Sequence, residues 1–180
     1  MQAPKFDTRM LARWSASFVG FPLAGLAAKA VAGPIDSTAA ALTGGLAAGA
    51  VLGLVQSLAL RASTRRRLQW VAATAIGLSA GLTLGAELVD HATDTASLVV
   101  MGAITGAGIG VAQSLVMAGP AWRRVVWLVL TPALWALGWL ITSQVIVDVD
   151  ARYANFGASG ALVCAVIGGV VLASGRVATP

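Results

Sequence analysis

The chain has 180 residues, of which 58% are apolar and only 11% carry a charge. A soluble domain usually carries about 25% charged residues, so a water-soluble globular fold is excluded. The mean hydropathy of +0.84 excludes a disordered chain. The single cysteine, Cys164, rules out an internal disulfide and matches no zinc-binding spacing. Composition therefore predicts an integral membrane protein.

Six apolar stretches are long enough to cross a bilayer, which takes roughly 20 helical residues. We expect these spans at about 14–33, 38–60, 68–88, 96–118, 124–146 and 156–174. Barrel strands would be about half as long and would alternate in polarity, and neither property is seen here. The predicted fold class is all-α integral membrane, with residues 1–180 forming a single domain of six transmembrane helices.

The charges orient these spans. If both termini are cytoplasmic, ten of the twelve basic residues lie inside and six of the seven acidic residues lie outside. Basic loops stay on the cytoplasmic side during insertion, so we expect an N-in, C-in topology in a bacterial cytoplasmic (inner) membrane. This sorting accounts for the pI of 10.7, and no nucleic-acid partner is expected. A cleaved signal peptide ending near residues 30–32 remains an alternative for the first span.

An internal repeat of 57 residues relates two parts of the chain. The first copy contains Gly45, Gly49, Gly53, Gln56, Ser57, Arg66, Arg67, Trp70 and Gly81. The second copy contains Gly102, Gly106, Gly110, Gln113, Ser114, Arg123, Arg124, Trp127 and Gly138. Partial copies keep the Trp14–Gly25 spacing and the small residues Gly160, Cys164 and Gly168. The repeat predicts three helical hairpins with pseudo-threefold symmetry, in units of roughly 1–60, 61–118 and 119–180.

The repeated glycines recur every four residues, which forms a ridge without side chains along one helix face. In lipid, such ridges let two helix backbones approach closely, so we expect packing surfaces. Glycines that line a narrow pore are the alternative. Gln56 and Gln113 fall on the same faces as these glycines. We expect them to form interhelical hydrogen bonds, with a polar constriction on a solute path as the alternative.

Two stretches carry a resemblance to known proteins: residues 49–67 with Trp70, and residues 106–124 with Trp127. Each has Gly-x-x-x-Gly-x-x-Gln in one span, then a short basic loop and an Arg-x-x-x-Trp entry to the next span. This arrangement resembles a group of uncharacterised small polytopic bacterial membrane proteins. The resemblance covers about half of the chain and implies a fold type without an activity.

Tryptophans and arginines alternate where the basic loops enter the membrane. An interfacial aromatic and basic belt is predicted from Trp14, Trp70, Trp122 and Trp127, with Arg66 and Arg123. An anionic lipid is the partner that such a belt favours at the cytoplasmic face.

Two groups of residues could carry chemistry. Glu87, Asp90, His91 and Asp94 would share one helix face if the third span continued through them, and could then hold a divalent cation. A solvated loop is the favoured interpretation. Residues 157–160 spell Gly-Ala-Ser-Gly, which resembles the rhomboid protease motif. That family takes its base from a later span, and the only histidine here lies upstream. The motif is therefore interpreted as a packing feature.

No cofactor is expected, because Walker A, dinucleotide and haem motifs are absent from the sequence. The favoured prediction is a non-enzymatic membrane protein that acts by helix packing, as an accessory or assembly subunit of a larger membrane complex or as a self-associating homo-oligomer. The alternative is a small-solute channel or facilitator lined by the Gly/Gln faces.

Overall fold

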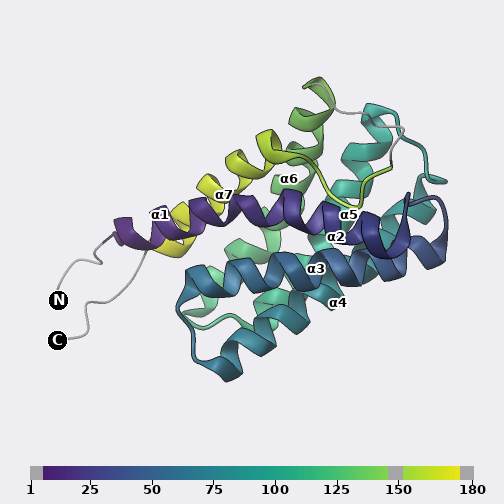
Figure 1. The fold of residues 1–180 in the computed structure, drawn as a ribbon. Coiled ribbons are helices and arrows are strands. Elements are labelled where there is room, and N and C mark those ends of the chain that lie inside the picture. The colour runs from purple at the N-terminus through teal and green to yellow at the C-terminus, as the bar shows by residue number, and fades with distance from the viewer. Residues whose placement is uncertain (1–5, 146–151, 175–180) are drawn as a thin grey trace.

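The computed structural model describes residues 6–145 and 152–174, and these ranges are helical with short connections (Figure 1). The first span is α1 (Thr8–Ala16), a 3-10 turn η1 (Ser17–Val19) and α2 (Gly20–Ala32). The remaining helices are α3 (Thr38–Leu60), α4 (Thr64–Leu88), α5 (Thr95–Val116), α6 (Ala121–Gln144) and α7 (Ala158–Ala173). Within the described residues, five apolar spans are long enough to cross a membrane, and α7 is a shorter apolar helix. The chain is thus a multi-pass, all-helical membrane protein.

The sixth span is shorter than the sequence predicted. It has 16 helical residues, whereas the expected span was 156–174. Residues 152–157 are not helical, and Gly157, with an extended ψ of 179°, caps α7. Since an exposed irregular backbone is costly in lipid, such a segment has to be buried in protein. Ala154, Asn155 and Phe156 are indeed buried.

The helix starts follow from local side-chain chemistry. Asp7, Ser37 and Asp94 each accept a hydrogen bond from the backbone N–H three residues later, which satisfies a donor that the first helical turn leaves free. The 3-10 turn η1 ends three residues before Pro22, which lies in the first turn of α2. Proline has no N–H for the carbonyl of Phe18, so the helix is weakened at that point.

Helices that follow one another in the chain pack side by side, from α2 against α3 to α6 against α7. The series closes on itself because α1 lies along α7 (Figure 1), and the backbone N–H of Asp7 donates to the carbonyl of Ala173 at 3.0 Å. In contrast, α2 and α7 have little contact.

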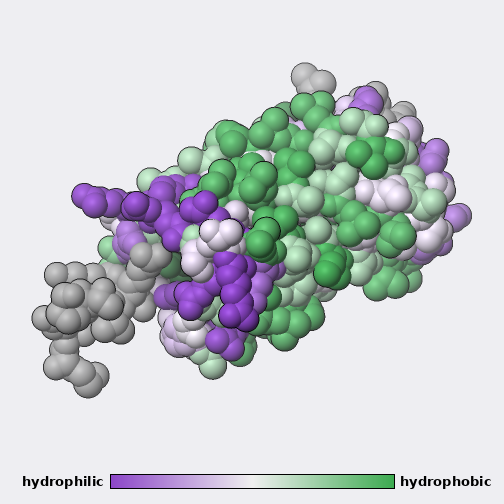
Figure 2. Space-filling model, turned by 60° about the horizontal axis from the view of Figure 1, so that its bottom comes forward, coloured by the Kyte–Doolittle hydropathy of each residue, from purple (hydrophilic) through white to green (hydrophobic). Residues whose placement is uncertain are grey.

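Charged side chains mark the two ends of the bundle. We call one the basic end; its charged residues include Arg61, Arg65, Arg66, Arg67, Arg123 and Arg124. The other is the acidic end, which carries Asp36, Glu87, Asp90 and Asp94. Figure 2 shows a large group of hydrophilic residues toward one end of the visible face, smaller groups at the other end, and apolar residues over much of the length between them. Lys5, Asp148, Asp150 and Arg176, which contributed to the predicted charge asymmetry, lie outside the described residues.

Candidate functional site

The repeated glycines lie where neighbouring helix backbones touch. A Cβ added at Gly49 would lie 2.5 Å from the Cα of Ala75, and one at Gly45 would lie 2.6 Å from the Cα of Ser79. One added at Gly106 would lie 2.7 Å from the carbonyl oxygen of Thr131. Such distances leave no room for a side chain, so the ridges of α3 and α5 are used for packing within this chain.

The two repeated glutamines meet in the interior. The Nε2 of Gln113 donates to the Oε1 of Gln56 at 3.2 Å and to the Oγ1 of Thr74 at 2.9 Å. The Oε1 of Gln56 also accepts from the indole N–H of Trp70 at 3.2 Å, and the Oε1 of Gln113 accepts from that of Trp127 at 2.9 Å. This amide network therefore joins α3, α4, α5 and α6 through charge-free hydrogen bonds.

Three repeat-related tryptophans close the network on one side. The ring centroid of Trp14 lies 6.0 Å from that of Trp70 and 5.6 Å from that of Trp127, and the last two are 6.3 Å apart. The two pairs that contain Trp14 are edge-to-face, a geometry that stabilises aromatic clusters. We call these residues the tryptophan triad.

The triad corrects the prediction of an interfacial belt. Trp70 and Trp127 are each only 4% exposed, and Arg123 is 8% exposed. The indoles turn inward because their N–H groups have amide acceptors in the interior, which compensates for removing those donors from water. Trp122, at 47% exposure, remains on the surface.

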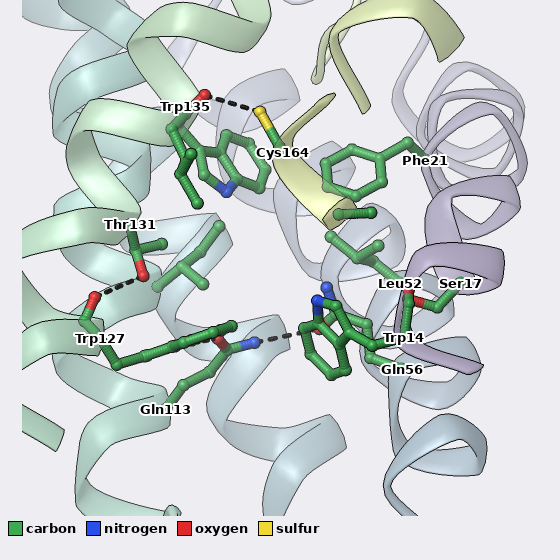
Figure 3. A pocket seen from close by; sticks show the side chains of 13 residues that line it. Trp14, Ser17, Phe21, Leu52, Gln56, Gln113, Trp127, Thr131, Trp135 and Cys164 are labelled. Carbon is green, nitrogen blue, oxygen red and sulfur yellow. Dashed lines mark hydrogen bonds between the residues drawn. The ribbon is translucent and has the colours of Figure 1, made fainter. Parts of the chain in front are cut away.

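A small cavity of about 30 Å³ lies beside the amide network. Gln56 and Gln113 border it near Trp14 and Trp127, whereas Phe21, Trp135 and Cys164 border its other end (Figure 3). That volume is enough for a water molecule. Aromatic rings lie at both ends of this cavity.

A much larger cavity of about 870 Å³ lies at the basic end. Arg61, Arg66 and Arg123 line it together with Ser63, and Trp70 of the triad forms part of its wall. Arg66 and Arg123 thus line the same cavity. Arg123 also donates to the carbonyl oxygen of Ser174, so it links α6 to the end of α7.

The predicted cation ligands do not share a helix face. Helix α4 ends at Leu88, and Asp90 and His91 have positive φ angles of 49° and 54°, which a continuing helix excludes. The Nε2 of His91 lies 3.4 Å from the Oε1 of Glu87. In residues 6–145 and 152–174, no group of three His, Cys, Asp or Glu side chains is placed to hold a metal.

Asp94, the fourth predicted ligand, has a different role. Its carboxylate accepts from the hydroxyl and the backbone N–H of Ser97, and these hydrogen bonds, the hydroxyl first, lower the pKa of Asp94. It is the N-cap of α5. The ionised carboxylate therefore caps the N-terminus of α5.

The Gly-Ala-Ser-Gly stretch forms the beginning of α7. Gly157 is its N-cap, and the Gly157 N–H donates to the Oγ1 of Thr142 at 3.1 Å. A Cβ added at Gly160 would collide with the backbone of Gly138. Each glycine therefore has a packing or capping role between α6 and α7.

The sequence interpretation missed Thr74 and Thr131, which are also 57 residues apart. Each threonine hydroxyl donates to the carbonyl of the tryptophan four residues earlier, Trp70 or Trp127. The repeat spacing could have identified this pair. Asn155 was missed as well, and it falls in no repeat.

Comparisons of the chain with protein-family models, with curated proteins and with solved structures each find no match.

Proposed function

We propose that this chain is a non-enzymatic accessory or assembly subunit of a membrane complex, built as one self-contained unit by helix packing. The amide network is the observation that carries this proposal. It pairs the Oε1 of Gln56 and both amide atoms of Gln113 with one another and with the indole N–H groups of Trp70 and Trp127, as expected for polar residues that fix helix register in lipid.

The glycine contacts refine this proposal. Because the ridges of α3 and α5 are occupied within the chain, association with another copy or with a partner uses other surfaces. The lipid-facing sides of the helices carry large exposed apolar residues, among them Leu84, Leu115 and Val129. These sides are where a neighbouring membrane subunit would pack.

We propose an N-in, C-in topology with pseudo-threefold symmetry in a bacterial inner membrane. The supporting observations are the arginines gathered at the basic end and the mutual contact of Trp14, Trp70 and Trp127. A cysteine introduced at Asp94 should react with a membrane-impermeant reagent in intact cells, and one at Ser63 should not. Labelling at Ser63 would contradict this topology.

The cavity at the basic end supports an anionic lipid as a partner. Arg61, Arg66 and Arg123 line it, and basic side chains at the cytoplasmic surface attract acidic headgroups. Replacing Arg66 by Gln should reduce the phosphatidylglycerol retained after gentle detergent extraction, whereas replacing Arg124 by Gln, which is outside the cavity lining, should not. Equal retention by both variants would argue against this site.

A small-solute facilitator is the second candidate, and the cavity that Gln56 and Gln113 line favours it. Flux would require the tryptophan triad on one side and Phe21 with Trp135 on the other to move apart. The same experiment tests both functions. In proteoliposomes, the accessory subunit should give no flux of small polar solutes, and Gln113→Leu should only lose stability. Wild-type flux that Gln113→Leu blocks would establish the facilitator, since leucine adds an apolar constriction.

A further inference from the structure

Two indoles that border the cavity of about 30 Å³ beside the amide network have no acceptor for their N–H groups. In the tryptophan triad, Trp70 and Trp127 donate to glutamine oxygens. Trp14 has no glutamine partner, and Val171 of α7 stands where a third glutamine would complete the repeat. The N–H groups of Trp14 and Trp135 make no hydrogen bond to any described residue.

The amide nitrogen of Gln56 is a third unpaired donor at this cavity. The oxygen of the same amide accepts from Gln113 and Trp70, but its Nε2 donates to no described residue. Gln56, Trp14 and Trp135 are only 7%, 3% and 4% exposed. None of the three nitrogens is among the described atoms that lack both a partner and accessible surface. Each of these donors is therefore unpaired and still accessible to a small molecule.

The three donors converge on the same space. Trp14, Gln56 and Trp135 all line the cavity, and Figure 3 shows the nitrogen of Trp135 on the ring edge that faces the glutamines. The nitrogens of Trp14 and Gln56 lie at the opposite end, on the side that faces Trp135 and Phe21 (Figure 3). The donors come from α1, α3 and α6, so a ligand that lies between them joins three helices.

Two hydroxyl oxygens at this cavity are left to accept hydrogen bonds. The hydroxyl of Ser17 donates to the carbonyl of Trp14, and that of Thr131 donates to the carbonyl of Trp127, each at 2.6 Å. Ser17 and Thr131 both line the cavity. Since their protons are engaged, their oxygens offer only lone pairs to a ligand. A ligand that both accepts and donates hydrogen bonds matches this set of groups.

The charge and the volume of the cavity favour water over an ion. None of the described residues that line it is charged, and Arg13, next to Trp14 in the chain, donates to the carbonyl of Ala59. A bare anion would lose its hydration here and would face two hydroxyl oxygens. A buried water molecule needs about 10–15 Å³, so this cavity has room for about two.

We propose that this cavity holds two water molecules in the interior of the membrane protein. They accept the N–H groups of Trp14, Trp135 and Gln56. They donate to the hydroxyl oxygens of Ser17 and Thr131. These five groups, with the bond between the two waters, give each water about three hydrogen bonds, which is usual for buried water. The waters take the place of a third glutamine and attach the first span to α3 and α6. The proposal goes beyond the accessory function and does not depend on it.

The experiment measures magnetisation transfer from water to the indole N–H groups of the isotope-labelled full chain in detergent micelles. Rotating-frame NMR separates dipolar contact from proton exchange by sign, and Trp14→Phe and Trp135→Phe each assign one signal. We expect dipolar cross-peaks from water at Trp14 and Trp135. Trp127 is the internal control, because it lines the same cavity but its N–H donates to Gln113. Its cross-peak should be several-fold weaker, since dipolar transfer falls with the sixth power of the distance.

Two variants and a change of salt identify the occupant. Ala165→Val adds bulk at a buried residue of the lining and should abolish both cross-peaks. Val166→Leu, at 42% exposure and outside the lining, should keep them. Replacing chloride by bromide should leave the indole chemical shifts of Trp14 and Trp135 unchanged.

Three results would overturn the proposal. The first is a pair of wild-type cross-peaks at Trp14 and Trp135 that are no stronger than that of Trp127, which would mean that the N–H groups are dry. The second is cross-peaks that persist in a folded Ala165→Val variant. The third is indole shifts that follow the halide, which would assign the cavity to an anion. If Ala165→Val does not fold, the wild-type comparison with Trp127 and the change of salt decide.

Discussion

Helices α3 to α6 touch one another backbone to backbone, whereas Phe156 of the non-helical segment 152–157 lies between α2 and α6. In the first region, a Cβ added at Gly81 of α4 would lie 2.7 Å from the Cα of Thr105 on α5. In the second, Phe156 fills the space, stacking on Phe21 with ring centroids 4.9 Å apart. Small residues on both helices close the first contact completely, and large ones leave a cavity at the second.

The difference follows the repeat. The full motif occurs in α3 and α5, and there each helix contributes a glutamine to the amide network. In α7 the small residues Gly160, Cys164 and Gly168 persist, but Val171 stands where the glutamine would be. Helix α7 is also the shortest span. The loss of the polar residue and of part of the helix therefore coincides with the region that contains the cavity.

The largest effect is expected from leucine at the tight contacts. Gly49→Leu and Gly106→Leu should each abolish folding or cost more than about 3 kcal/mol, because the added side chain meets backbone atoms and forces the helices apart. The measurement is thermal unfolding with the elution profile in detergent.

Ala80→Leu is the matched control, since Ala80 is exposed on α4 next to Gly81. It should leave stability nearly unchanged. If both glycine variants behaved like this control, the close approach of α3 to α4 and of α5 to α6 would be wrong.

The next effect compares alanine at the two regions directly. Gly81→Ala should cost about 1–3 kcal/mol, since its Cβ meets the backbone of Thr105. Gly25→Ala should be close to neutral, because its Cβ faces only the Asn155 amide at 3.2 Å and alanine raises helix propensity by about 1 kcal/mol. Equal losses in the free energy of unfolding for Gly81→Ala and Gly25→Ala would contradict the difference between the two regions.

The sequence predicts the helical membrane fold because span length and hydropathy are local properties. Five of the expected spans are confirmed as long helices. It also places Gln56 and Gln113 on helix faces with glycines, since the repeat reports which side chains recur. The inward turn of Trp70 and Trp127 could not be predicted this way, because tryptophan near arginine is equally typical of a lipid interface. Each indole turns inward because its N–H donates to a glutamine amide on another helix. Such a contact depends on the tertiary structure.

The shortened α7 and the cavity that Asn155 lines were missed for a related reason. Residues 156–174 are apolar enough to be helical throughout, so hydropathy gives no sign of the extended segment. Its conformation depends on Thr142, which accepts from the N–H of Gly157, and on Phe21, whose carbonyl accepts from Asn155. Each contact joins the non-helical segment to a helix, α6 for Gly157 and α2 for Asn155.

A smaller loss is expected from Gln113→Leu. This change removes two donated bonds and one accepted bond, but such bonds average about 0.6 kcal/mol in membranes. We expect a total loss of about 1–2 kcal/mol, measured by unfolding in mixed micelles, and a smaller loss for Gln56→Leu. Gln144→Leu, at an exposed position near the end of α6, is the control and should change little. An unchanged stability of Gln113→Leu would mean that the network does not hold the four helices together.

The smallest effect is expected at Asp94, outside the membrane spans. Its pKa is lowered by hydrogen bonds from Ser97, so the ionised cap stabilises α5 fully above the unfolded pKa of about 3.9. That contribution is lost as the pH falls through the lower folded pKa. Asp94→Asn keeps a capping side chain without a charge, so its contribution does not titrate. The unfolding temperature of the wild type should therefore exceed that of Asp94→Asn at pH 6 in low salt. The difference should shrink toward pH 3, and also in high salt because the side chain is exposed. A constant difference across this range would show that the carboxylate charge contributes nothing to the start of α5.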